Sequence, residues 1–185
     1  MRVWKQKRGS MQHYDKQATI YNVHYLVEQN AKIETMLSRM TFRRNEKVLD
    51  LGCGTGFLFP YLAQKAEFLV GLDISKKVLH EAKKRARGHL NIHIIRADAD
   101  TTPFLGGIFN KILSITVLQN MPKPKKTITE MKRTAKAEAI FAVTGLKKKF
   151  TEERFVNLLE NGKLKVLSLN TDEQLKGYVA ICKNL

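Results

Sequence analysis

The residues of this sequence whose types and spacing could do chemistry are three glycines and the acids near them. The stretch VLDLGCGTG, residues 48–56, places Asp50 at the end of an apolar run and then Gly52, Gly54 and Gly56 at alternate positions. Glycine tolerates positive φ angles and lets a ligand approach the main chain without meeting a Cβ atom. A helix that starts after such a turn offers unpaired amides and partial positive charge. The stretch therefore predicts a ligand held against bare backbone.

Two further aspartates end apolar runs in the same way. Asp73 closes LVGLD and Asp98 closes IIRAD. Ligands of parallel sheets bind at the carboxyl ends of the strands, so all three acids are expected at one edge. A carboxylate at position 73 can accept both ribose hydroxyls, in charge-assisted hydrogen bonds that contribute about 1.5–3 kcal/mol. Asp98 can accept from an adenine amino group. Each acid alone would also suit a helix cap or a solvated loop, but three at successive strand ends favour a binding site.

The glycine spacing separates two classes of ligand. A dinucleotide site has the pattern Gly-x-Gly-x-x-Gly, and here Phe57 stands where the third glycine would be. Asp50 would repel a pyrophosphate but could bind an ammonium group. A ligand with a sugar, a carboxylate and an amino group fits better, and S-adenosylmethionine has all three.

The elements that must position these residues alternate along the chain. Periodicity and capping residues predict a helix over 17–40 and then strands and helices in turn. The predicted strands are 47–52, 67–74, 91–98, 111–118 and 139–146, and the predicted helices are 57–66, 76–87, 124–136 and 151–162. Two last strands, 163–170 and 177–184, are too close in sequence for a crossover helix and must be antiparallel.

This order predicts an α/β fold with five βα repeats and a terminal hairpin. The sheet is expected to be doubly wound, seven-stranded and mostly parallel, with an antiparallel C-terminal hairpin and helices on both faces. We expect one domain over residues 1–185. Within it, 1–44 form an N-terminal arm and lid helices, 45–150 the cofactor-binding core, and 151–185 a helix and the hairpin.

With these motifs the sequence resembles the class I S-adenosylmethionine-dependent methyltransferases over nearly its whole length. VLDLGCGTG is similar to the first motif of that family, GLDIS to its second and RADADTTPF to its third. The segment FNKILSITVLQNMPKPKKTITEMKRTAK is similar to the fourth strand and the helix after it. YDKQATIYN resembles the N-terminal helix that covers the cofactor in many members, and the resemblance implies that Tyr14 and Tyr21 close this lid, although both also suit helix packing.

The resemblance implies a role for each motif residue. The methionine part of the cofactor would be wrapped by Gly52, Cys53, Gly54 and Gly56, with Asp50 near its amino group. Asp73 would hold the ribose, and Ile74 would pack on the adenine. Asp98 would meet the adenine amino group, with the amide of Ala99 beside it, and Ser114 would border the sulfonium. Cys53 is a small residue in the turn, and nothing near it in sequence would lower the pKa of a thiol.

The methylated atom stays open at this stage. Enzymes that methylate nucleobase amino groups often carry an Asn/Asp/Ser-Pro-Pro-aromatic tetrad after the fourth strand, and here Asn120, Met121 and Pro122 keep only part of it. Asn120 is the candidate catalytic residue. Methyl transfer depends mostly on alignment, and the sequence shows no Ser-His-Asp arrangement and no metal-ligand spacing.

The charge indicates the class of partner. The chain has a net charge of +16 and a pI of about 9.9, which favours a polyanion. Lysines follow the second, fourth and fifth expected parallel strands, and a basic arm precedes them: Lys76, Lys77, Lys123, Lys125, Lys126, Lys147, Lys148 and Lys149, with Arg2, Trp4, Lys5, Lys7 and Arg8. We predict that this basic face binds RNA, which is methylated at a base in rRNA or tRNA.

Other functions remain open from the sequence. The chain could methylate a protein or a small molecule, or be a non-catalytic binding subunit that has kept the fold, and an activating protein subunit could assist it. No apolar run approaches the roughly 18 residues of a membrane span. Cys53 and Cys182 offer no disulfide framework, so a cytoplasmic setting is the simplest inference.

Overall fold

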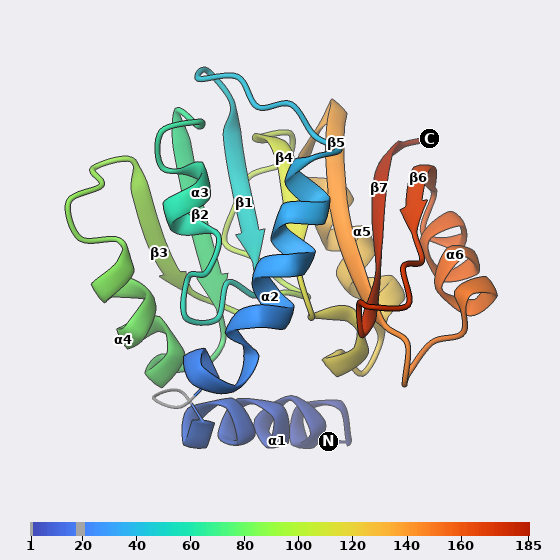
Figure 1. Cartoon of the computed structure of the whole chain (residues 1–185), viewed down its shortest axis with the longest axis horizontal. Helices are drawn as coiled ribbons and strands as arrows, with labels where there is room; N and C mark the ends of the chain where they lie inside the picture. The colour runs from blue at the N-terminus through green and yellow to red at the C-terminus, as the bar shows by residue number, and fades with distance from the viewer. Residues whose placement is uncertain (1, 18–20) are drawn as a thin grey trace.

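The computed structural model describes residues 2–17 and 21–185, and Figure 1 shows how their helices and strands are arranged. Tyr21 begins a described helix, but its side chain lies outside the described residues. In chain order the elements are α1 Arg2–Gln17, α2 Tyr21–Leu37, β1 Lys47–Leu51, α3 Phe59–Leu62, β2 Phe68–Asp73, α4 Lys76–Arg85, β3 Ile92–Arg96, β4 Phe109–Ser114, the 3₁₀ turn η1 Leu118–Asn120, α5 Pro124–Thr134, β5 Ala135–Leu146, α6 Glu152–Asn161, β6 Leu164–Asn170 and β7 Gly177–Asn184.

The seven strands form one sheet in the order β3-β2-β1-β4-β5-β7-β6. Neighbours from β3 to β5 are parallel, whereas β7 is antiparallel to both β5 and β6. The predicted fold class is therefore confirmed, including the antiparallel terminal hairpin. The strand order reverses between β1 and β4, which is the place where sheets of this kind hold their ligands.

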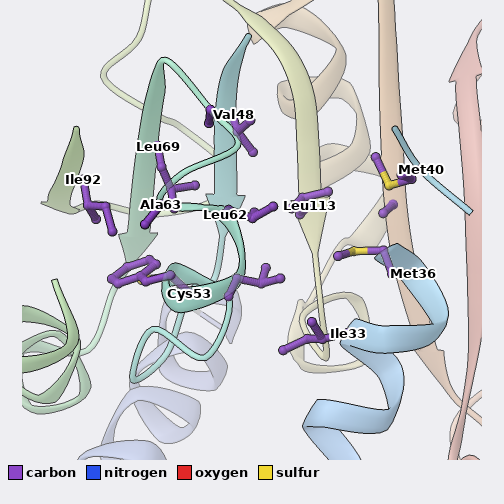
Figure 2. Close-up of a cluster of buried hydrophobic side chains, with 14 of the residues drawn as sticks. Ile33, Met36, Met40, Val48, Cys53, Leu62, Ala63, Leu69, Ile92 and Leu113 are labelled. Atoms are coloured by element: carbon purple, nitrogen blue, oxygen red, sulfur yellow. The ribbon is translucent and has the colours of Figure 1, made fainter. Parts of the chain in front are cut away.

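Helices cover both faces of the sheet, and each face has its own apolar core. On one face α2, α3 and α4 contribute to a cluster that includes Ile33, Met36, Leu62 and Leu79; Figure 2 shows part of it, with Cys53 among these side chains. On the other face α5 and α6 supply Ile128, Met131, Phe155 and Leu159. Full burial of each large side chain contributes about 1.5–3 kcal/mol, and together the clusters hold the strand ends in register.

The structure corrects several predicted element bounds. The helix expected over 57–66 is only α3, Phe59–Leu62, because turns after the glycines take up the residues before it. Its Pro60 lies in the first turn, where a missing N–H costs nothing. The helix expected over 124–136 ends at Thr134, and β5 starts at once at Ala135. The fourth strand, expected to reach 118, ends at Ser114.

The N-terminal and central regions also differ from the prediction. The single helix expected over 17–40 is only partly confirmed by α2, and a separate helix, α1, occupies Arg2–Gln17. The connection from β3 to β4, residues 97–108, contains no helix, so the expectation of five complete βα repeats was wrong. The predicted elements themselves placed no helix between the third and fourth strands, so the count of five repeats did not follow from them.

Helix α1 lies across the edge of the sheet at which the parallel strands end (Figure 1). This placement brings residues from the start of the chain next to the predicted motifs. Among the described residues, no helix combines the length and apolar character needed to cross a membrane.

Candidate functional site

A cavity of about 110 Å³ lies at the carboxyl ends of β1, β2, β3 and β4, under α1. Its walls come from segments far apart in sequence. The lining residues that matter for the argument are Lys7 and Tyr14 from α1, Gly52 and Gly54 from the first turn, Asp73 and Ile74 after β2, Asp98 and Ala99 after β3, and Thr116 and Asn120 after β4.

The turn after β1 exposes its backbone to this cavity. Gly52 and Gly54 have φ angles of +76° and +54°, which a residue with a side chain rarely adopts. The Gly52 amide donates to the Leu72 carbonyl, 2.7 Å away, which holds the turn against β2. A Cβ built on Gly52 would collide with Val117, whereas one built on Gly54 would meet no atom within 4 Å. Space for a ligand therefore lies over Gly54.

Arg85 of α4 fastens this turn from outside. Its Nη1 donates to the carbonyl oxygen of Thr55 at 2.6 Å and to the Thr55 hydroxyl at 2.7 Å. The guanidinium also lies 4.3 Å from the centre of the Phe57 ring. Burial lowers the pKa of Arg85. Arg85 and Thr55 are 30 residues apart, and no local pattern in the sequence indicated this contact.

Asp73 is held by backbone amides at the end of β2. Gly54 N donates to its Oδ2 at 3.1 Å and Ser75 N to its Oδ1 at 2.9 Å. Burial raises the pKa of Asp73, and these hydrogen bonds oppose the rise. The carboxylate is thus tied to the glycine turn and keeps further lone pairs for a ligand in the cavity.

Asp98 lies in an ion cluster with α1. The Nζ atom of Lys7 is 2.7 Å from both carboxylate oxygens of Asp98 and 2.5 Å from Oδ2 of Asp100. Lys7 is only 7% exposed. Burial lowers the pKa of its ammonium group, but the hydrogen bonds to Asp100 and Asp98 and the charges of these two acids together outweigh burial, and the pKa ends above the usual value. Lys7, expected in an RNA-binding arm, instead holds α1 on the sheet edge.

A second part of α1 holds the same edge. Asp15 accepts hydrogen bonds from the hydroxyl of Ser75 and, at 3.2 Å, from the amide of Lys77. Ser75 also caps α4, since its Oγ accepts from Val78 N. The helix is therefore fixed at both β2 and β3 by charged groups.

Asp50 has a different environment from the other two acids. It is 2% exposed, and no residue in the described part of the chain donates a hydrogen bond to it. Burial, followed by the nearby charge of Asp73, raises the pKa of Asp50 to about 8. Cys53 beside it is buried in the apolar core, and burial raises the pKa of its thiol well above the usual value. A reactive thiolate is therefore disfavoured.

The end of β4 forms the wall opposite the glycine turn. Ser114 is fully buried, and its Oγ has no hydrogen-bond partner among the described residues. The cavity itself is bordered by Ile115, Thr116 and Val117, just beyond it. Thr116 has a φ angle of +64°, an outlier for a β-branched residue. Asn120, from η1, also faces the cavity.

The structure thus brings most of the expected residues together. Gly52, Gly54, Asp73, Ile74, Asp98, Ala99 and Asn120 line the cavity, whereas Asp50, Cys53, Gly56 and Ser114 lie outside its lining. The roles of Lys7, Arg85 and Thr116 were missed, because each depends on partners distant in sequence or on a backbone angle. Within residues 2–17 and 21–185, no group of acids, histidines and cysteines is arranged to hold a metal ion.

Comparison with known sequences gives a direct family match. The profile of a methyltransferase domain matches residues 42–179. An uncharacterized protein of Methanocaldococcus jannaschii is 31% identical over 140 residues, which are 76% of this chain and 53% of that protein. The malonyl-[acyl-carrier protein] O-methyltransferase of Salmonella typhimurium is 26% identical over 72% of this chain and 51% of its own length. The chain thus spans about half the length of these curated relatives.

Solved structures share the fold at low sequence identity. An S-adenosylmethionine-dependent methyltransferase from Aquifex aeolicus has a TM-score of 0.71 at 20% identity, covering 80% of this chain and 87% of that one. A chain from the complex between the Haloferax volcanii Trm112 methyltransferase activator and a methyltransferase has a TM-score of 0.77 at 14% identity, covering 92% and 96%.

Proposed function

Because the chain belongs to the class I S-adenosylmethionine-dependent methyltransferases, we propose that it transfers the methyl group of this cofactor to a base of RNA. The observation that carries the methyl-transfer part is the open space over Gly54, next to a carboxylate held by that same turn. When bound, S-adenosylmethionine supplies an electrophilic methyl group on a sulfonium. The residues present fit this cofactor.

Each end of the cavity suits one part of the cofactor. Asp73 would accept the ribose hydroxyls, and Ile74 and Ala99 would pack on the adenine. The adenine amino group would donate to Asp98, whose Oδ2 accepts from Lys7 alone among the described residues. Gly54 would let the methionine part lie on the backbone, and Asp50, buried behind the turn, would attract its ammonium group. Water is excluded on the outer side by α1.

The distribution of positive charge supports RNA as the acceptor. Lys76 and Lys77 after β2, Lys123, Lys125 and Lys126 after β4, and Lys148 and Lys149 after β5 all follow strand ends at the cavity edge. The outer side of α1 adds Lys5 and Arg8, with Trp4 52% exposed. Exposed aromatic rings next to cations suit bases and phosphates, since base stacking contributes about 1–3 kcal/mol.

Lys147, one lysine of the predicted RNA-binding face, makes hydrogen bonds within the protein. The Nζ atom of Lys147 donates to the carbonyl oxygens of Thr171 and Asp172, at 3.0 and 2.6 Å. Lys147 therefore joins the end of β5 to the loop between β6 and β7, and we leave it out of the proposed RNA surface.

A small-molecule or carrier-bound acceptor is the second candidate. It is favoured by the Salmonella relative, which is a malonyl-[acyl-carrier protein] O-methyltransferase. Such an acceptor would use the same cavity and leave the lysines for solubility. An activating protein subunit is a further proposal, since a chain of the same fold was solved with the Trm112 activator.

A labelling experiment tests the acceptor class. The purified protein is incubated with methyl-labelled S-adenosylmethionine and, in separate reactions, with total RNA, with protein extract or with a metabolite fraction. Each reaction is repeated with the acidic proteins of the protein extract added, to supply the proposed activating subunit. We expect label in RNA. Label confined to metabolites or protein would reject RNA and support the second candidate.

A further inference from the structure

The turn after β1 leaves space for the methionine part of the cofactor but has few groups to hold its carboxylate. The amides of Gly52 and Cys53 both donate to the carbonyl oxygen of Leu72, at 2.7 and 3.0 Å. The amide of Gly54 donates to the carboxylate of Asp73 at 3.1 Å. These three amides are therefore used within the protein, and a carboxylate over the turn needs another source of positive charge.

The helix that follows the turn does not supply this charge. The helix predicted over 57–66 would begin at the turn, with the partial positive charge of its N-terminus next to a ligand. Helix α3 instead has four residues and begins at Phe59. So few aligned peptide units produce little charge at the helix end, and the effect falls off within one turn. Asp50 and Asp73 lie beside the glycines, and both would repel a carboxylate.

Arg85 of α4 brings a full positive charge to the back of the turn. Its Nη1 donates to the carbonyl oxygen and to the hydroxyl oxygen of Thr55, at 2.6 and 2.7 Å. Thr55 is fully buried and lines the cavity, whereas Arg85 lies outside the lining. The guanidinium is thus separated from the space over Gly54 only by the turn that it holds.

The charge of Arg85 is half-buried and has no acidic partner among the described residues. Glu81, one turn earlier on α4, is paired with Lys84 at 2.8 Å. In the described part of the cavity lining Lys7 is the one cation, and it is held in its own ion cluster by two carboxylates. Partial burial of an unpaired charge is unfavourable, so Arg85 would stabilise an anion that binds over the turn.

We propose that Arg85 is a positioning residue that holds the glycine turn through Thr55 and supplies the positive charge for the carboxylate of the methionine part. This inference rests on the proposed methyl transfer and deepens it, because it assigns a residue that selects S-adenosylmethionine over ligands without this carboxylate. The turn then has an acid, Asp50, for the ammonium group and a cation for the carboxylate. Such a pair matches the zwitterionic end of an amino acid.

The first experiment measures this selectivity in the unsubstituted protein. Calorimetry compares S-adenosylmethionine with its decarboxylated form, which keeps the sulfonium, the nucleoside and the amino group. We expect S-adenosylmethionine to bind about tenfold more tightly, the size of one charge interaction across a partly solvated wall. Equal affinities would overturn the role of Arg85 and leave methyl transfer standing, whereas a protein that binds neither ligand would overturn both.

The second experiment assigns the selectivity to Arg85. Arg85→Gln keeps a hydrogen-bond donor for Thr55 but removes the charge, so it should weaken S-adenosylmethionine about tenfold more than the decarboxylated form. A loosened turn alone would weaken both ligands equally, because both lie over Gly54. Arg85→Lys keeps the charge and should restore most of the difference.

Arg87→Gln is the matched control, since it removes the same charge from an exposed position just after α4. It should leave the ratio of the two affinities as it is. An equal loss for both ligands in Arg85→Gln, or the same ratio in Arg85→Gln and Arg87→Gln, would reduce Arg85 to a structural residue and overturn the proposal. The first measurement needs no variant, so it tests the proposal even if Arg85→Gln does not fold.

Discussion

The two ends of the cavity are built on opposite principles. At the tips of β2 and β3, Asp73 and Asp98 are already satisfied by backbone amides and by Lys7. At the tips of β1 and β4, Asp50 and the hydroxyl of Ser114 are buried with no hydrogen-bond partner among the described residues, and Thr116 is strained. The first end already has hydrogen bonds of its own and keeps lone pairs for a ligand, whereas the second has buried polar groups without partners just behind the cavity lining.

This difference indicates what each end contributes. A buried polar group without a partner costs about 1–3 kcal/mol, so a ligand that supplies one recovers that free energy on binding. A side chain that is already hydrogen-bonded changes its position little when a ligand binds. We infer that the β2–β3 end offers a preformed binding surface, and that the contribution of the β1–β4 end to affinity depends on how far a bound ligand compensates its buried polar groups.

The largest expected effect comes from a substitution at the β2–β3 end of the cavity. Asp73→Ala should weaken cofactor binding about 10- to 100-fold, because the variant cannot make charge-assisted hydrogen bonds to the ribose. Calorimetry with S-adenosylmethionine measures this directly. Glu173→Ala, an exposed acid between β6 and β7, is the control for the change in charge. Equal affinities in the two variants would show that Asp73 does not hold the ribose.

The ion cluster of the same end should set how fast the cofactor exchanges. Lys7→Met leaves Asp98 and Asp100 without their shared cation, and removing one partner of a buried pair is strongly destabilising. We expect α1 to dock less firmly and cofactor dissociation to become about tenfold faster, measured by stopped-flow fluorescence. Lys5→Met, on the exposed side of α1, should leave the rate as it is. If the cofactor dissociates from Lys7→Met no faster than from the unsubstituted protein, α1 does not retain the cofactor.

The unpaired end should respond to pH. The pKa of Asp50 is raised to about 8, so below that pH the ligand-free site is protonated and must lose its proton to pair with an ammonium group. Affinity should therefore rise about tenfold per pH unit from pH 6 to 7 and level off above about 8, with about one proton released on binding at pH 7. Calorimetry in buffers of different ionisation enthalpy measures the number of protons released on binding. Asp50→Asn should abolish the release, and release that persists in this variant would assign it elsewhere.

The raised pKa of Asp50 also predicts how the stability of the protein without cofactor depends on pH. A carboxyl group with a raised native pKa binds its proton more tightly when folded, so ionisation favours the unfolded chain. Stability should fall as the pH rises from about 4 to about 8, and Asp50→Asn should flatten this part of the profile. Urea unfolding across that range is the measurement, and an identical pH profile in both proteins would contradict it.

The smallest expected effect concerns lysines outside the cavity and tests whether they bind RNA, the proposed acceptor. Replacing Lys148 and Lys149 with Gln should reduce the slope of log K against log salt for RNA binding by about one for each phosphate that the variant no longer neutralises. Lys147 is kept because it fixes the β6–β7 loop. Lys163→Gln with Lys165→Gln, at the start of β6, is the matched control. The same slope in all three proteins would move the RNA path away from the end of β5.

Much of the fold and half of the site could be predicted from sequence because the signals are local. Gly52 and Gly54 stand next to Asp50 in one turn, and Asp73 closes an apolar run that could only be a strand. The early end of β4 was harder, because apolar runs of similar length suit either a strand or the turn after it. Tertiary pairing, and the φ angle of Thr116, decided that bound.

The sequence by itself determined the order of the strands and of the α-helices from α2 onward, the bare backbone over Gly54 and the three acids at strand ends, since each follows from neighbouring residue types. Only the tertiary structure decided that Lys7 pairs with Asp98, that Arg85 donates to Thr55 and that Asn120 donates to Tyr14. These pairs are separated by 91, 30 and 106 residues. No local pattern records such contacts, because they form only when packing of the two apolar cores brings the strand ends and α1 to one edge of the sheet.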